Sequence, residues 1–194
     1  MAKTLRISRS FNFETEWYQD VKSSIEGKLS YWDVEFFSNS SLTVMGKDEF
    51  YGYVKKHNLR DDEVDIIKEN LVYSLSRYSR PTASPIADRV YLRKNSHNGG
   101  ERSNIAVKFH GDPSLINDRI VVTQTVDSAI GLSNQWPPNY IFNLSICRVE
   151  GLLDEHQTNR IAQRLASIVL PKSGVRFEAI MIEPITLLGR KQST

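Results

Sequence analysis

The sequence predicts an α+β protein with two lobes, each a small, mostly antiparallel sheet backed by helices, around a central cleft. Apolar residues recur at strand period and helix period in alternating segments along all 194 residues. The order is strand, helix, strand, strand, helices, and then strand, helix, strand, helix, strand. Two of the short strands, one in each half of the chain, also carry related tetrapeptides. We therefore expect a single two-lobed domain over 1–194, with halves of approximately 1–95 and 103–194.

The first half is expected to contain three strands, three helices and one further candidate strand, over 86–93. Trp17, Val21 and Ile25 are spaced by four, which is typical of an amphipathic helix. Gly46 marks the end of a short strand, and either Asp61 or Asp62 can cap the longest helix. In order, the segments are a strand over 5–13, a helix that closes near 27, strands over 31–37 and 41–45, helices over 47–56 and from 61 or 62, and a strand over 86–93.

The second half follows a turn or mobile loop over 95–102 that contains Gly99-Gly100. A strand over 104–109 leads to Asp112-Pro113, which has the form of a helix start, and Gly131 suits the end of that helix. Its β-branched stretch 120–123 could form a strand instead. Trp136-Pro137-Pro138 is expected to be a rigid turn. A strand over 140–149, a helix capped by Asp154 and Gln157 that includes 161–169, a strand over 175–184 and a polar tail complete the chain.

The related tetrapeptides are Ser41-Leu42-Thr43-Val44 and Asn143-Leu144-Ser145-Ile146. Side chains alternate between the two faces of a strand, so the polar residues of each tetrapeptide share one face. If the lobes face each other, four hydrogen-bonding groups converge, and such a cleft suits a phosphate group. The alternative is that these are solvent-facing side chains on half-buried strands.

The surroundings of both tetrapeptides resemble the two-histidine (2H) phosphoesterase superfamily, which includes the RNA 2′,3′-cyclic phosphodiesterases also called 2′–5′ RNA ligases. The stretch Ser40-Ser41-Leu42-Thr43-Val44-Met45-Gly46 looks like the first motif of that family, and Phe142-Asn143-Leu144-Ser145-Ile146-Cys147-Arg148-Val149 looks like the second. The resemblance covers nearly the whole chain. It implies a 2H phosphoesterase-like fold in which one histidine acts as general base, the other as general acid, and the Thr or Ser hydroxyls hold the phosphate without a metal.

This chain departs from the family at both histidine positions, where Ser41 and Asn143 stand. Neither residue can exchange a proton near pH 7 as a histidine does, and each general acid or base contributes roughly 10²–10⁴-fold to rate. The resemblance thus implies a non-catalytic protein, a pseudoenzyme that binds a phosphate, nucleotide or RNA ligand. Its ligand-binding residues would be Ser41, Thr43, Asn143, Ser145 and Arg148.

Two alternatives remain open at the level of sequence. The first is an active RNA or cyclic-nucleotide phosphodiesterase with relocated proton-transfer groups, for which His110 is the best-placed residue and His97 the next. The second is a protein-interaction module with a vestigial cleft and a protein partner. Basic and tyrosine residues in the middle of the chain could contact RNA or form an ordinary charged surface. They are Arg77, Arg80, Arg89, Arg93, Lys94, Arg102, Tyr73, Tyr78 and Tyr91.

Composition narrows the function classes further. The 25 basic and 23 acidic residues nearly balance, so charge alone indicates neither a nucleic acid nor a membrane as partner. The single cysteine, Cys147, excludes an intrachain disulfide and a cysteine-based zinc cluster, and the four histidines do not pair at metal-ligand spacing. We expect no cofactor and no metal. The apolar runs are too short to span a membrane, and a cytoplasmic location is the default expectation.

Overall fold

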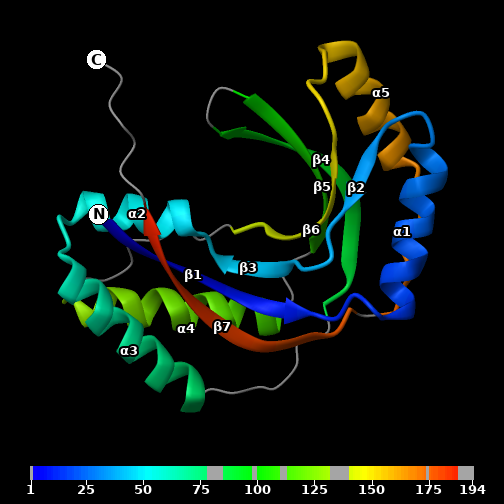
Figure 1. Ribbon diagram of the computed structural model, residues 1–194. Helices are drawn as coiled ribbons and strands as arrows, with labels where there is room; N and C mark the ends of the chain where they lie inside the picture. Colours follow the sequence, from blue (N-terminus) through cyan, green and yellow to red (C-terminus); the bar gives the residue numbers. More distant parts are fainter. Residues whose placement is uncertain are drawn as a thin grey trace, which may run out of the picture.

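The structure is a computed structural model that describes residues 2–77, 85–97, 100–109, 113–131, 140–173 and 175–187. Its strands form two antiparallel sheets, a three-stranded one in the order β3-β1-β7 and a four-stranded one in the order β2-β6-β5-β4 (Figure 1). The strands are β1 (Ala2–Phe11), β2 (Val34–Phe36), β3 (Ser41–Met45), β4 (Ala87–His97), β5 (Gly100–Phe109), β6 (Phe142–Val149) and β7 (Phe177–Leu187). The helices are α1 (Glu16–Lys28), α2 (Lys47–Lys56), α3 (Asp61–Arg77), α4 (Pro113–Ala129) and α5 (Glu155–Ala166).

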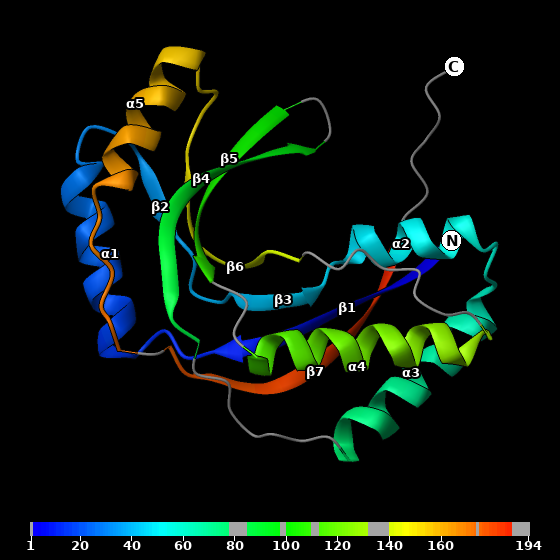
Figure 2. The ribbon, with the colours of Figure 1, turned by 180° about the vertical axis from the view of Figure 1, so that it is seen from behind.

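Helices cover one face of each sheet, which confirms the predicted α+β class. The core of the four-stranded sheet packs against α1 and α5, through residues such as Val21, Ile25 and Ile161. The core of the three-stranded sheet packs against α2, α3 and α4, through residues such as Phe50 and Ile67. Figure 2 shows α4 running along the three-stranded sheet, with α1 and α5 at the far side of the other sheet. Each sheet thus keeps one face free of these helices.

Strands from both halves of the chain interlace in the two sheets. The last strand, β7, pairs with the first, β1, while the short β2 from the N-terminal half pairs with β6. The boundary expected between 1–95 and 103–194 falls at the β4–β5 hairpin, inside the four-stranded sheet. The two sheets therefore do not coincide with the two halves of the sequence.

Several segment predictions are corrected by the structure. The loop expected over 95–102 is largely strand, because β4 extends to His97 and β5 starts at Gly100, and backbone pairing between the two outweighs the turn signal of the glycines. The strand expected over 31–37 shortens to β2. The last strand continues past Pro184, which is compatible with β7 lying at the edge of its sheet. The helix expected to include Val169 ends at Ala166, and Val169 is 87% exposed.

The helical prediction for the segment after Asp112 is confirmed, so the β-branched stretch 120–123 is not a strand. Val122 and Val126 lie in the core, where tertiary packing outweighs their low helix propensity. Asp154 caps α5 as predicted, since its side chain accepts a hydrogen bond from the Gln157 amide at 2.7 Å. His110, Asp112 and the Trp136-Pro137-Pro138 turn lie outside the described residues.

Candidate functional site

The two strands that carry the related tetrapeptides are neighbours. Cα atoms of β3 approach those of β6 to within 8 Å, and both ribbon views place the strands side by side (Figures 1 and 2). In the segment that leads from β2 to β3, the Phe37 amide donates to the Ile146 carbonyl at 3.0 Å. At the other end, Arg119 contacts both the Val44 carbonyl and the ring of Tyr140. Taken in order along the chain, these contacts indicate that β3 is antiparallel to β6.

Ser41 and Thr43 share one face of β3, as predicted from strand alternation. Leu42 and Val44 are fully buried on the opposite face, whereas Thr43 is half-buried and Ser41 is 8% exposed. On the face of Ser41, the guanidinium of Arg6 from β1 approaches, and its Nη2 donates to the Ser41 hydroxyl at 2.7 Å. A cation therefore stands beside the first predicted polar position.

Asn143, Ser145 and Arg148 lie on one face of β6 because of a bulge. Alternation alone would put Arg148 on the opposite face from Ser145. The register with β5 jumps from Ser145 to Cys147, and both Ile146 and Cys147 are buried, so the strand turns over once between them. The bulge brings Arg148 back to the face that carries Asn143 and Ser145.

The amide of Asn143 is held at both ends. The Tyr91 hydroxyl donates to its Oδ1 at 2.7 Å, and its Nδ2 donates to the Ile141 carbonyl at 3.0 Å. Burial raises the pKa of Tyr91, an effect that the nearby Arg93 and Arg89 partly oppose. Tyr91 therefore keeps its proton at neutral pH, and Asn143 is fixed in one orientation.

Arg148 is engaged by two carboxylates. Its Nη2 forms an ion pair with Glu35 on β2, and its Nε donates to Glu150 Oε1 at 2.8 Å. The bond from Arg148 lowers the pKa of Glu35 and the same bonds raise the pKa of Arg148. The charge that the sequence assigned to ligand binding is thus compensated by neighbours on its own sheet.

Residues that sequence reasoning did not place beside the tetrapeptides lie there, and of these Arg89, Tyr91 and Arg93 were named from the sequence only as residues that could contact RNA. Besides Arg6 and Tyr91, they include a row of cations across β4 and β5. Register places Arg89 opposite Lys108, and Lys108 opposite Asn143, so these side chains share the face of Asn143. Arg93 lies on the same face two positions beyond Tyr91. The period of two in Arg89, Tyr91 and Arg93 was the signal that could have placed them on one face.

The histidines do not gather at this site in the described part of the chain. His156 is exposed in the first turn of α5, and His57 follows α2, with its ring 4.6 Å from that of Tyr53. Across the described ranges, no three His, Cys, Asp or Glu side chains are grouped to hold a metal ion. Among the helices described, none has the length and apolar character needed to cross a membrane.

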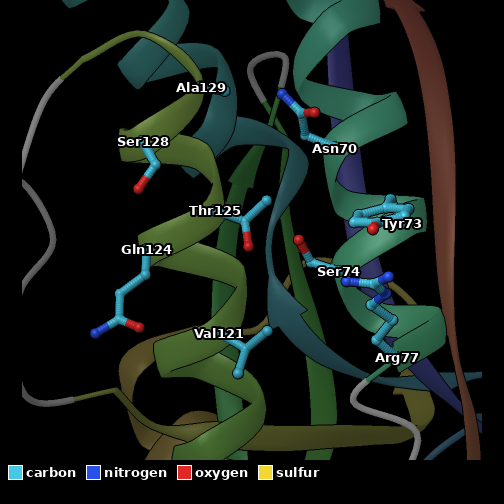
Figure 3. Close-up of a pocket in the computed structure, with 9 residues that line it drawn as sticks. All are labelled: Asn70, Tyr73, Ser74, Arg77, Val121, Gln124, Thr125, Ser128 and Ala129. Carbon is cyan, nitrogen blue, oxygen red and sulfur yellow. The ribbon is translucent and has the colours of Figure 1, made fainter.

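A groove of about 630 Å³ lies elsewhere, between α3 and α4 (Figure 3). Figure 3 shows Thr125 and Ser74 projecting from the two helices toward the space between them, with Arg77 at one end. The guanidinium of Arg77 lies 4.4 Å from the centroid of the Tyr73 ring. Because α3 and α4 cover the opposite face of the sheet from Ser41 and Thr43, this groove is separate from the tetrapeptide strands.

Comparison with known proteins identifies the fold. No family model matches the sequence. No curated protein matches it either. The structure of Kluyveromyces marxianus Usb1 superposes with a TM-score of 0.62 at 8% sequence identity, and the match covers 92% of each chain. The predicted two-lobed α+β fold is thereby confirmed, and the likeness concerns the fold alone.

Proposed function

We propose that this protein binds RNA, or a cyclic or short oligonucleotide, through a phosphate group at β3 and β6, and does not cleave it. The observation that carries the proposal is the Arg6–Ser41 hydrogen bond on the face that also presents Thr43. A guanidinium with adjacent hydroxyl groups offers the charge-assisted hydrogen bonds by which proteins recognise phosphate oxygens. Ser145 on the neighbouring β6 would complete the site.

The residues at the two positions where the two-histidine phosphoesterases have histidines are not suited to proton transfer. Asn143 has no titratable proton, and both ends of its amide are occupied by Tyr91 and the Ile141 carbonyl. The Ser41 hydroxyl accepts a hydrogen bond from the Arg6 guanidinium, which cannot take up a proton. Tyr91 could supply a proton, but a reaction by this route also needs a general base. We therefore favour binding over hydrolysis.

The cations of β4 and β5 extend the phosphate site into a surface suited to a longer ligand. Arg89 and Arg93 are exposed, and Tyr91 lies between them on the same strand. Basic side chains that follow a backbone, interrupted by an aromatic ring, are typical of surfaces for single-stranded nucleic acid. A cytoplasmic location and the absence of a cofactor remain predictions from the sequence.

Fluorescence anisotropy with a labelled single-stranded RNA that ends in a 2′,3′-cyclic phosphate tests this proposal. Arg6→Gln, and separately Thr43→Val with Ser145→Ala, should each weaken binding about tenfold, because each removes charge-assisted or hydroxyl bonds to a phosphate. Arg60→Gln is the matched control, since Arg60 is an exposed arginine at the start of α3. Wild-type affinity in both site variants would contradict the proposal.

The same samples distinguish the alternative of an active phosphodiesterase. Chromatography of the RNA after incubation should show no opening of the cyclic phosphate by the unmodified protein. If opening is seen and disappears in Tyr91→Phe or His110→Ala, the proton-transfer groups have been relocated. If neither RNA nor cyclic nucleotide binds at all, a protein partner becomes the favoured ligand.

A further inference from the structure

Arg119 on α4 contacts both β3 and the residue that leads into β6. It is 6% exposed. Its Nη1 donates to the Val44 carbonyl of β3 at 2.8 Å, and its guanidinium lies 4.0 Å from the centroid of the Tyr140 ring. Tyr140 precedes the first residue of β6 by two positions. One side chain therefore joins the end of β3 to the beginning of β6.

A third contact fixes the orientation of the Arg119 guanidinium. Both of its terminal nitrogens bond to the carboxylate of Glu49 on α2, with Nη1 to Oε2 at 3.1 Å. Glu49 Oε2 also accepts from the Gly46 amide at 3.4 Å, at the junction between β3 and α2. A planar guanidinium held by a two-pronged carboxylate and a carbonyl has little rotational freedom. The ring of Tyr140 therefore packs against a guanidinium group of fixed orientation.

Backbone pairing does not extend along β3 and β6, because they belong to different sheets. The backbone bond from Phe37 to the Ile146 carbonyl ties the chain to β6 only before β3 begins. β3 pairs with β1, and β6 pairs with β5 and β2, so no ladder of backbone hydrogen bonds joins the two strands among the pairings of either sheet. Along β3 itself, side-chain contacts therefore contribute to the separation of the two strands. Arg119 makes such contacts next to Thr43 on one strand and at the entry to Asn143 on the other.

We propose that Arg119 is a positioning residue that sets the separation of Thr43 and Ser145. The further claim that it thereby tunes the affinity of the phosphate site rests on the proposed function. A lysine at position 119 would keep the positive charge, but it would lack the planar set of donors and the flat face that packs against Tyr140. Arg119→Lys therefore isolates geometry from charge.

Cysteine cross-linking measures the separation directly. Thr43→Cys and Ser145→Cys are combined with Cys147→Ala and treated with bifunctional methanethiosulfonates of graded length. With Arg119 present, one reagent length should react in highest yield and the others should fall off steeply. Arg119→Lys should flatten this length profile, and so should Tyr140→Leu, which removes the contact at β6 and leaves Val44 and Glu49 untouched.

Tyr53→Phe is the matched control for general loosening of α4. The Tyr53 hydroxyl donates to Asp127 Oδ1 at 3.0 Å, so this variant loses a buried bond between α2 and α4. Its length profile should equal that of the unmodified protein. Profiles that stay equally narrow in Arg119→Lys and Tyr140→Leu would overturn the positioning role, as would a profile that flattens as much in Tyr53→Phe.

Binding of the cyclic-phosphate RNA tests the claim about affinity. Arg119→Lys should bind about tenfold more weakly, with Tyr53→Phe unchanged. Wild-type affinity in Arg119→Lys together with a flattened cross-linking profile would overturn the link to affinity. If the unmodified protein binds no RNA, the proposed function fails, and the cross-linking result still decides the positioning role.

Discussion

Among the described residues, Arg9 and Arg119 are buried and paired with carboxylates, and the Arg9–Asp118 pair is the more enclosed. The side chains of Arg9 and Asp118 are 2% and 3% exposed. Arg9 Nε and Nη2 reach the two carboxylate oxygens of Asp118 at 2.5 and 2.9 Å, and Nη1 donates to the Glu178 carbonyl at 2.7 Å. This geometry meets the conditions under which a buried ion pair offsets its desolvation. It also ties α4 to β1 and β7.

Removing one partner of this pair should destabilise the protein strongly. Arg9→Met leaves the Asp118 carboxylate buried and uncompensated, so we expect the free energy of unfolding to fall by about 3–5 kcal/mol. Urea unfolding measures the change. The double variant Arg9→Met with Asp118→Leu should recover most of the loss, because no buried charge is then left without its partner. A loss in the double variant equal to that in Arg9→Met would contradict this explanation.

The buried hydroxyl of Tyr140 and the buried thiol of Cys147 should make the free energy of unfolding fall at high pH. Burial raises the pKa of Tyr140 from its ordinary value of 10.0 to about 12 and raises the pKa of the Cys147 thiol above its usual 9.0. Because both groups hold their protons more tightly when folded, their contribution to stability is complete below pH 9. It should be lost as pH rises from 9 toward 12, by about 1.4 kcal/mol per pH unit for each group that titrates.

Urea unfolding between pH 7 and pH 11 checks this sign. Stability that rises above pH 9 would contradict it. Cys147→Ala should delay the loss to near pH 10, where the unfolded tyrosine begins to ionise. As an independent measurement, Ellman's reagent should not modify Cys147 at pH 8 until urea unfolds the chain, because the thiol is fully buried.

At the scale of elements, α5 starts with a reciprocal pair of hydrogen bonds. Asp154 accepts from the Gln157 amide, and the Gln157 side chain accepts from the Asp154 amide at 3.0 Å. These bonds satisfy two of the amides that the first turn of a helix leaves without partners. The helix holds Ile161 and Leu165 against the four-stranded sheet.

Asp154→Ala should lower the free energy of unfolding by about 1 kcal/mol, because it removes the cap. Asp154→Asn should retain most of the stability, since its amide oxygen can accept the same bond. His156→Ala is the control in the same turn and is expected to change stability by less than about 0.5 kcal/mol, since His156 is exposed. Thermal or urea unfolding gives the comparison, and an Asp154→Ala variant as stable as His156→Ala would count against the cap.

Elements with local signals were predicted well from the sequence. The bounds of β3 and α2 agree with the expected 41–45 and 47–56, because Gly46 separates them and the helix period of Phe50, Tyr53 and Val54 is clear. The strands expected over 86–93 and 104–109 are shorter than β4 and β5, since Gly99-Gly100 and its polar neighbours are typical of a loop. Pairing with a partner strand is a nonlocal effect, and composition does not report it.

The site contacts were less predictable for the same reason. Arg6 and Ser41 are 35 residues apart in sequence, Tyr91 and Asn143 are 52 apart, and Arg119 and Val44 are 75 apart. The tetrapeptides could be found because each lies within one strand. The cations beside them depend on strand order, and the position of Arg148 depends on a bulge, so neither follows from alternation in a single strand.

At the scale of the whole molecule, the interlaced sheets bring together positions that are more than one hundred residues apart. If Ser41 and Asn143 occupy the positions of the acid and base histidines in the two-histidine phosphoesterases, which the sequence resembles, Ser41→His with Asn143→His should rebuild the pair. We expect metal-independent hydrolysis of a 2′,3′-cyclic phosphate with a bell-shaped dependence on pH, because one histidine must be protonated and the other neutral.

Each single substitution is the control and should give much less activity, since acid and base act together. Recovery need not be large, because misplacement by about 1 Å can cost roughly 10²-fold in rate. Hydrolysis of a cyclic-phosphate substrate, followed by chromatography, gives the rates. A folded double variant that binds the substrate with no rate above background would separate the shared fold from a shared geometry of catalysis.

Pro184 in β7 affects how copies of the protein interact at high concentration. β7 lies at the edge of the three-stranded sheet, so it offers its outer row of amides and carbonyls to any free strand. Pro184 has no amide hydrogen, and the charged Glu183 stands next to it. An approaching second copy cannot form a continuous ladder past this point. Pro184, which is tolerated in an edge strand, therefore disfavours edge-to-edge aggregation of the protein.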